Sequence, residues 1–220
     1  MYFGGICAAG KGTRFGGDTP KQFVLLKGKP LIAYSVEEML KCPQIEKIFV
    51  AVSPDYIDYC KKLFADSRVE VTEGGESRSQ TVAAMAERAL RTGGGEDIMI
   101  THDAARPLVS AEAFISCAKA AEQYGASGAA LPATDTVLQC RDGFVCAAPL
   151  RSEMFLAQTP QCFKLGLFRE VWSLISPEER EAATDVCGMF FRAGKKVKIV
   201  EGEKSGVKVT VEEDLNRLRG

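Results

Sequence analysis

A glycine-rich and cationic segment stands directly after the first apolar run of the chain. Residues 8–17 read AAGKGTRFGG, and PKQ follows at 20–22. Glycines at such a place let backbone N–H groups approach a phosphate closely, and Arg14 and Lys21 add positive charge. The P-loop spacing is absent, and Phe15 stands where a dinucleotide motif has its third glycine, which disfavours a dehydrogenase. We interpret the segment as a phosphate-binding loop; the alternative is an ordinary solvated loop.

A second candidate is HDAARP at 102–107, which follows another apolar run. Asp103 can receive a ribose hydroxyl or approach a metal, and the guanidinium of Arg106 can pair with a phosphate. A buried Asp–Arg pair that only shapes the loop is an equal alternative. His102 is the only histidine. With no Ser or Cys placed to partner it, we interpret it as structural.

Three weaker candidates lie further along the chain: Arg151 with QTPQ at 158–161, Thr184-Asp185, and Lys208 within VKVT. Together the candidates supply hydroxyls and cations, few carboxylates and no evident pair of nucleophile and base. This inventory suits phosphoryl or nucleotidyl transfer, because that chemistry proceeds by positioning and charge neutralisation.

The elements that must position these residues alternate between strand and helix. This order predicts an α/β fold with a mainly parallel sheet, helices on both faces and ligands at the carboxyl ends of the strands. The expected strands are Tyr2–Ala8, Ile45–Ser53, Val69–Thr72, Asp97–Asp103, Gly128–Ala133, Lys196–Glu201 and Val207–Val211. The expected helices are Pro30–Leu40, Pro54–Ala65, Ser77–Arg91 (with Ser77 and Gln80 as a capping box), Ser110–Tyr124, Lys164–Ile175, Thr184–Ala193 and Glu212–Arg219.

The segment 136–150 interrupts this alternation. It consists of two alternating runs joined by Arg141-Asp142-Gly143, and Asp-Gly between such runs predicts a β-hairpin. We interpret the hairpin as an arm that reaches a second subunit. An antiparallel edge of the main sheet is an equal alternative.

Composition sets the remaining limits. The 220 residues carry a net charge of −1, which argues against bulk electrostatic binding of nucleic acid or of an anionic membrane. We expect one domain over 1–220, with the arm at about 134–152, and no membrane span. The eight cysteines form no CxxC, so no zinc site is expected. The N-terminus does not look like a secretory signal, which leaves the cytoplasm as the expected location.

Taken together, the motifs resemble the 2-C-methyl-D-erythritol 4-phosphate cytidylyltransferase family. The matching pieces occur in the family's order and cover nearly the whole chain: AAGKGTRF, PKQF, GGESRSQTV, HDAARP, PATDT, RSEMFLAQTPQCF, ATD and EGEKSGVKVTVEEDL. The resemblance implies transfer of CMP from CTP to a polyol phosphate by a Rossmann-like nucleotidyltransferase fold, a three-layer αβα sandwich with a twisted sheet. It also implies a homodimer joined through the arm, and Mg²⁺ held mainly by the nucleotide phosphates rather than by residues of the chain.

The resemblance also implies roles for individual residues. The nucleotide would be bound by Ala8, Ala9, Gly10, Gly12, Arg14, Lys21, Gly75, Glu76, Thr81, Asp103 and Ala104. The acceptor would be bound by Arg106, Thr136, Arg151, Thr159, Thr184 and Lys208, with Thr136 and Arg151 reaching the partner subunit's substrate. Arg14, Lys21, Arg151 and Lys208 would be the catalytic cations.

Three positions depart from the family pattern: Leu138, where the family usually has Lys; Val186, where it has an acidic residue; and Gly206, where it has Asn. Val186 would remove a carboxylate beside the acceptor pocket. The departures leave the nucleotide end intact and the acceptor open between methylerythritol phosphate and another polyol phosphate such as ribitol 5-phosphate. The alternative of another class is a non-catalytic nucleotide-binding module.

Overall fold

A seven-stranded sheet forms the centre of the molecule, in the order β11-β7-β10-β6-β1-β4-β5. The computed structural model describes residues 1–10, 15 and 19–219. The strands are β1 (Tyr2–Ala8), β4 (Ile45–Val52), β5 (Val69–Glu73), β6 (Ile98–Asp103), β7 (Ala126–Pro132), β10 (Phe155–Lys164) and β11 (Lys198–Glu201). Only β10 runs antiparallel to its neighbours. The prediction of a mainly parallel sheet is therefore confirmed.

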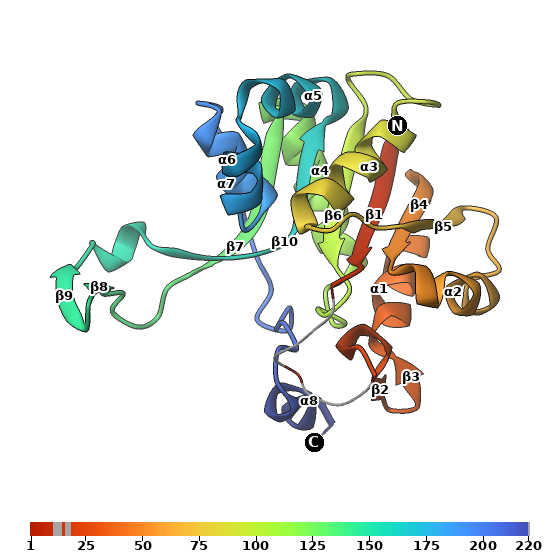
Figure 1. Cartoon of the computed structure of the whole chain (residues 1–220), viewed down its shortest axis with the longest axis horizontal. Helices are drawn as coiled ribbons and strands as arrows, with labels where there is room; N and C mark the ends of the chain where they lie inside the picture. The colour runs from red at the N-terminus through yellow and green to blue at the C-terminus, as the bar shows by residue number, and fades with distance from the viewer. Residues whose placement is uncertain (11–14, 16–18, 220) are drawn as a thin grey trace.

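Helices cover both faces of this sheet, which gives three layers (Figure 1). One face packs on α1 (Leu31–Leu40), α2 (Ile57–Leu63) and α4 (Ala111–Tyr124), and the other on α3 (Arg78–Ala89), α5 (Leu165–Leu174) and α7 (Val186–Arg192). Side chains of a strand alternate between the two cores: in β4, Ile48 and Val50 enter the first, and Phe49 and Ala51 the second. Both faces of the strand are buried, so its sequence is a continuous apolar run.

One expectation about the strands is wrong, and one strand was not predicted. The predicted strand Val207–Val211 is irregular backbone, because Val209 is buried with Leu26 and Leu215 in a small separate cluster and β11 already occupies the sheet edge beside β7. Sequence reasoning also missed β10, the antiparallel strand that carries the QTPQ motif. The other predicted elements are present, with ends displaced by a few residues.

The hairpin stands apart from the main sheet. Its strands β8 (Gln139–Arg141) and β9 (Phe144–Ala147) pair only with each other, and Asp142 and Gly143 take the positive φ angles of a tight turn, 51° and 84°. Figure 1 shows it projecting from the body at the end of β7 and β10. The alternative of an antiparallel edge of the main sheet is therefore wrong.

A small lobe closes the lower end of the molecule in Figure 1. It contains the 3₁₀ turn η1 (Lys21–Phe23), the short pair β2 (Leu25–Leu26) and β3 (Lys29–Pro30), and the C-terminal helix α8 (Glu212–Arg219). The guanidinium of Arg219 donates to the carbonyl of Leu25 at 3.1 Å, which ties α8 to this pair. The lobe also holds the irregular segment before α8, because Val209 of that segment is buried with Leu26 and Leu215.

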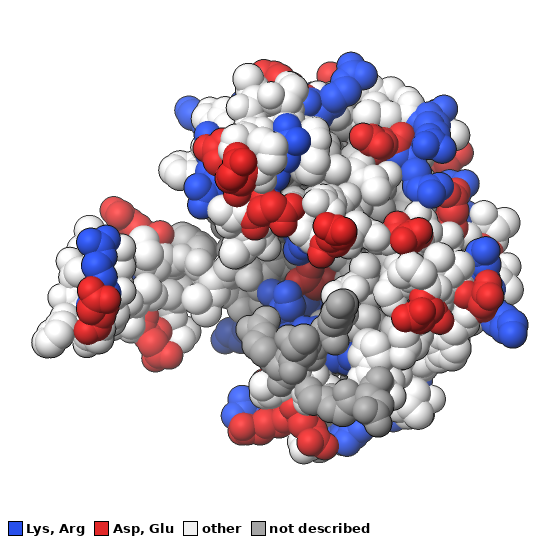
Figure 2. All heavy atoms as spheres, in the orientation of Figure 1, with Lys and Arg blue, Asp and Glu red and all other residues white. Residues whose placement is uncertain are grey.

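The longest helix in the described part of the chain has 14 residues, and none there has the length and apolar character to cross a bilayer. On the face shown in Figure 2, acidic and basic side chains of the described residues are interspersed rather than gathered into one field. The described part of that face therefore offers no broad positive surface to a polyanion.

Candidate functional site

The site lies where β1 and β6 end side by side. Cys7 of β1 pairs with Asp103 of β6, and β1 separates β6 from β4, so the order of strands along the chain reverses at this point. In open α/β sheets such a reversal leaves a crevice at the carboxyl ends of the strands. The crevice here contains two adjoining cavities.

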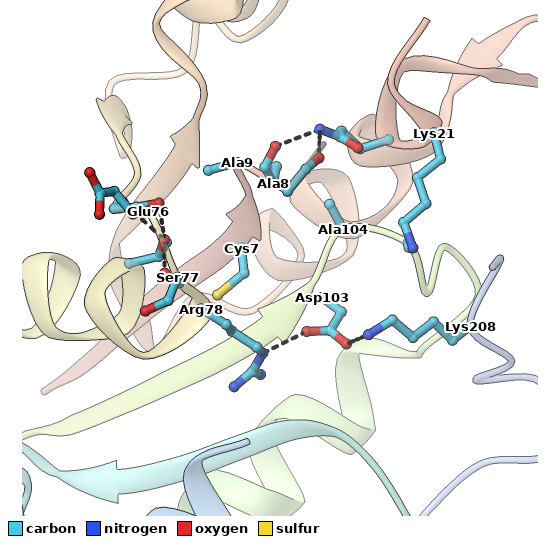
Figure 3. Close-up of a pocket in the computed structure, with 15 residues that line it drawn as sticks. Cys7, Ala8, Ala9, Lys21, Glu76, Ser77, Arg78, Asp103, Ala104 and Lys208 are labelled. Atoms are coloured by element: carbon cyan, nitrogen blue, oxygen red, sulfur yellow. Dashed lines mark hydrogen bonds and ion pairs between the residues drawn. The ribbon is translucent and has the colours of Figure 1, made fainter. Parts of the chain in front are cut away.

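The first cavity encloses about 190 Å³ and is shown in Figure 3. The segment after β1, the η1 turn, the β5–α3 connection and the segment after β6 form its walls. Ten of the predicted nucleotide-site or catalytic residues lie together here: Ala8, Ala9, Gly10, Lys21, Gly75, Glu76, Thr81, Asp103, Ala104 and Lys208. The remaining two predicted on this side, Gly12 and Arg14, lie outside the described residues.

Gln22 fastens the glycine-rich segment to the η1 turn. Its Nε2 donates to the carbonyl of Ala8 at 2.7 Å and to that of Gly10 at 3.1 Å. The next residue, Phe23, stacks on Tyr56 with ring centroids 4.1 Å apart. These contacts fix η1 against the body, so the backbone that carries Lys21 is held at the rim of the first cavity.

The β5–α3 connection is shaped by Thr81 and Gly75. The Thr81 hydroxyl accepts from the Gly75 amide at 3.0 Å and donates to the carbonyl of Ser77 at 2.9 Å. A Cβ on Gly75 would lie 2.5 Å from that of Gln80, so no larger residue fits without displacing α3. The predicted capping box is half present: Ser77 caps α3, but the Gln80 side chain accepts from the amide of Glu76.

Asp103 is the centre of a charged cluster at the floor of the cavity. Arg78 Nε donates to its Oδ1 at 3.1 Å and Lys208 Nζ to its Oδ2 at 2.7 Å, while Arg106 Nε lies 3.9 Å from Oδ2. Burial alone would raise the pKa of this carboxyl, but Arg78 and Lys208 hold its pKa well below the ordinary value. Asp103 is therefore a permanent anion that holds cations in place.

Sequence reasoning missed Arg78, although it stands within the GGESRSQTV piece. Burial would lower the pKa of its guanidinium, but Asp103 outweighs that effect and raises it. Its Nη2 is buried and has no hydrogen-bond partner among the residues that the structure describes. A buried donor without a partner costs free energy, unless a ligand in the cavity accepts a hydrogen bond from it. The sequence feature that could have identified Arg78 is a basic residue near the start of the helix expected after Gly74 and Gly75.

The second cavity encloses about 200 Å³ and shares Arg78, Asp103 and Lys208 with the first. Its remaining wall comes from Arg106, residues 157–159, Gln161 and the Thr184–Asp185 turn. The predicted acceptor residues Arg106, Thr159, Thr184 and Lys208 are therefore together here. The charged cluster is the boundary at which the two cavities meet.

His102 and Thr159 form a buried support beneath the second cavity. The Thr159 hydroxyl lies 2.9 Å from His102 Nδ1 and accepts from the amide of Asp103 at 3.2 Å, and His102 Nε2 lies 3.1 Å from the carbonyl of Arg106. Burial lowers the pKa of His102 to about 4, so the imidazole is neutral at pH 7. The contacts agree with a structural histidine. These contacts also mean that the Thr159 hydroxyl already has hydrogen-bond partners within the protein.

The structure shows where the three residues that depart from the family pattern lie. The Val186 side chain is only 2% exposed and belongs to the second core, and it does not line the second cavity. The Gly206 carbonyl accepts from Arg106 Nη1 at 2.7 Å, a bond that a side chain at this position does not supply. Leu138 is exposed at the base of the arm, outside both cavities.

Thr136 and Arg151 are not brought to the cavities of their own chain. Both are exposed on the arm, and Arg151 Nη1 donates to the carbonyl of Thr134 at 3.3 Å. Neither residue lines the first or second cavity. Their predicted action on a partner subunit's substrate stays a prediction.

Thiols and metal-ligand clusters do not contribute to the described site. All eight cysteines are free, and burial raises the pKa of Cys7, which lines the first cavity, to about 11. A protonated thiol is a weak nucleophile. Over residues 1–10, 15 and 19–219, no three His, Cys, Asp or Glu side chains gather as a metal cage.

Comparison with known proteins gives a consistent result. The model of one family, IspD, 2-C-methyl-D-erythritol 4-phosphate cytidylyltransferase, matches residues 5–219. Among solved structures, the Francisella tularensis enzyme of that name is 28% identical, with a TM-score of 0.84 over 98% of this chain and 97% of the other. The Thermus thermophilus enzyme is 26% identical, with a TM-score of 0.77 over 99% and 96%. The 4-diphosphocytidyl-2C-methyl-D-erythritol synthase of Anaerococcus prevotii shares the fold at 24% identity, with a TM-score of 0.83 over 100% and 94%.

Proposed function

The chain belongs to the 2-C-methyl-D-erythritol 4-phosphate cytidylyltransferase family, and from that premise we propose how its two cavities divide the reaction. The enzyme is a nucleotidyltransferase that uses CTP to cytidylylate 2-C-methyl-D-erythritol 4-phosphate in isoprenoid synthesis. We assign CTP to the first cavity and the polyol phosphate to the second. The observation that carries this division is the shared boundary of Arg78, Asp103 and Lys208.

The acceptor supplies its own nucleophile. A phosphate monoester has a second pKa of about 6, so it is largely dianionic at neutral pH and needs no general base. Its oxygen forms a bond to the α-phosphorus of CTP, and the bond from that phosphorus to the bridging oxygen breaks as pyrophosphate leaves with the electron pair. The protein forms no covalent bond in this scheme. This agrees with a described site that holds cations and a neutral histidine but no activated nucleophile.

The cations overcome the repulsion between the two anions. Lys208 lines both cavities, which suits a side chain that touches the acceptor phosphate and the reacting α-phosphate at once. Lys21 lines only the first cavity, where it suits charge that develops on the α-phosphate; Arg14 keeps the same assignment by family position. Removal of one such preorganised cation costs on the order of 3 kcal/mol of transition-state stabilisation, or about a hundredfold in rate.

Magnesium is assigned to the nucleotide rather than to a protein cage. Both carboxylate oxygens of Asp103 already accept from cations, so the described site offers a metal few free oxygens. Mg²⁺ commonly binds substrate phosphates and waters with one or two carboxylates at most, and these residues fit that mode. When bound with CTP, the ion would neutralise charge on the triphosphate.

The arm is assigned to a homodimer, and the protein to the cytoplasm. Large apolar side chains on and beside the arm are exposed in the single chain: Phe144, Val145, Leu150, Phe155 and Leu156. An apolar projection of this kind is typical of a surface that pairs with another protein. Multi-angle light scattering at micromolar concentration should give twice the mass of one chain; a monomer would contradict both the dimer and the action of Arg151 across it.

A paired-substrate assay tests the assignment of the second cavity. Purified protein with CTP and Mg²⁺ should release pyrophosphate with 2-C-methyl-D-erythritol 4-phosphate and far more slowly with ribitol 5-phosphate. Release only with ribitol phosphate would overturn the acceptor assignment. No release with either acceptor, while CTP still binds, would favour the non-catalytic module.

A further inference from the structure

Lys208 reaches the boundary of the two cavities from an irregular segment, residues 202–209. This segment forms no helix or strand, and its own backbone closes only one turn, from the Gly206 amide to the Glu203 carbonyl at 2.9 Å. The Val209 amide donates to the carbonyl of Ala105 at 2.8 Å, just beyond Lys208. Contacts from neighbouring elements must therefore determine the shape of the Glu203–Gly206 turn.

The side chain of Gln158 holds this turn through both the backbone amide and the backbone carbonyl of one residue, Glu203. Its Oε1 accepts from the Glu203 amide at 3.1 Å, and its Nε2 donates to the Glu203 carbonyl at 3.0 Å and lies 3.5 Å from that of Gly206. Gln158 is buried in β10, with 8% of its surface exposed. A Cβ on Gly202 would lie 2.4 Å from Gln158 Oε1, so the segment approaches as closely as a bare backbone allows.

We propose that Gln158 is a positioning residue for the transfer reaction, because it holds the Glu203–Gly206 turn in the conformation that presents Lys208 to the junction of the cavities. The proposal rests on the role assigned to Lys208 in the proposed function. The turn ends two residues before Lys208, so a change in its shape moves the backbone that carries the ammonium group. Gln158 is neutral, and it acts through the segment rather than by charge.

A second glutamine on the same strand provides a matched control. Gln161 is also buried, but its side chain contacts the other wall: Nε2 donates to Asp185 Oδ2 at 2.9 Å, and Oε1 accepts from the Val186 amide at 2.9 Å. It also lies 3.3 Å from the Gln158 carbonyl, a contact that the Gln158 side chain does not make. No described hydrogen bond joins Gln161 to residues 202–209, so its loss should act independently of Lys208.

The test is a double-mutant cycle between Gln158→Met and Lys208→Met, with pyrophosphate release measured while the acceptor concentration is varied. Methionine keeps the approximate length of glutamine and removes every hydrogen bond of its amide. Gln158→Met should lower kcat/KM for the acceptor by about tenfold and change KM for CTP less than about threefold. In the Lys208→Met background the same substitution should lower kcat/KM for the acceptor by less than about threefold. Gln161→Met should change kcat/KM for the acceptor by the same factor in the wild-type and Lys208→Met backgrounds.

Equal effects of Gln158→Met in the two backgrounds would overturn the proposal and leave the proposed function standing. If Lys208→Met itself left kcat/KM unchanged, the role of Lys208 would be wrong and this inference would fall with it. Thermal unfolding of each variant checks that it folds. If Gln158→Met does not fold, Gln158→Asn, which keeps the amide but is one methylene too short, enters the same cycle.

Discussion

The two cavities are built differently, and the difference explains what each demands of the sequence. The first is formed mainly by short segments that follow β1, β5 and β6, with the η1 turn and Lys208 completing it, so most of its wall residues lie close in sequence to strand ends. The second depends on β10, on the turn before α7 and on the irregular segment around Lys208. Most walls of the first cavity are thus encoded by local sequence motifs. The second cavity depends on buried side chains that hold distant segments together.

The largest effect that separates the cavities is expected from Lys21→Ala. Lys21 lines the first cavity alone, and the loss of a preorganised cation should lower kcat by about a hundredfold, on the order of 3 kcal/mol. KM for the acceptor should change little, because the second cavity is untouched. Steady-state kinetics with each substrate varied in turn measures both quantities. A loss confined to CTP affinity, with kcat preserved, would contradict the assigned role.

A smaller effect, on stability, is expected from the support beneath the second cavity. His102 has a pKa lowered to about 4 in the fold, against about 6.5 in an unfolded chain, so the unfolded state binds more protons between these values. Its contribution is complete above pH 6.5 and is lost as the pH falls toward 4. Between pH 7 and 5 the free energy of unfolding should fall by about 2 kcal/mol from this group.

His102→Asn should make the free energy of unfolding fall less between pH 7 and 5, since the chain has no other histidine. The lowered pKa of Asp103 adds a separate contribution, which is present above about pH 3.9 and is lost only below it. Urea unfolding of both proteins at several pH values between 4 and 7 gives the comparison. Equal slopes in wild type and variant would show that the imidazole is not held neutral.

The smallest effect is expected from Leu138→Lys, which restores the residue usual in the family. Leu138 is 51% exposed and lies outside both cavities, so its substitution should change the free energy of unfolding by less than about 0.5 kcal/mol. kcat/KM for the acceptor should stay within about twofold. A larger gain in acceptor use would show that the base of the arm takes part in the second cavity.

The first cavity was largely predictable because its signals are local. Gly75, Thr81, Asp103 and Lys21 stand in motifs next to strand ends, and the structure brings them together as expected. Arg78 was missed because its importance comes from a partner 25 residues away, Asp103, and from its own burial.

The second cavity was less predictable because long-range contacts override local patterns. Val207, Val209 and Val211 alternate with polar residues as in a strand, but Val209 is buried against Leu215 of α8 instead of pairing in the sheet. The β10 strand escaped prediction because Gln158 and Gln161 look like surface residues. They are buried, and each satisfies its amide on a segment at least 24 residues away.

A crystal structure with an unreactive CTP analogue and 2-C-methyl-D-erythritol 4-phosphate would show directly whether the two cavities divide the substrates as proposed. The triphosphate should lie in the first cavity and the acceptor phosphate in the second, within hydrogen-bond reach of Lys208. The acceptor oxygen should then lie in line with the bond from the α-phosphorus to its leaving oxygen. An acceptor phosphate bound away from the boundary of Arg78, Asp103 and Lys208, or a nucleotide outside the first cavity, would contradict it.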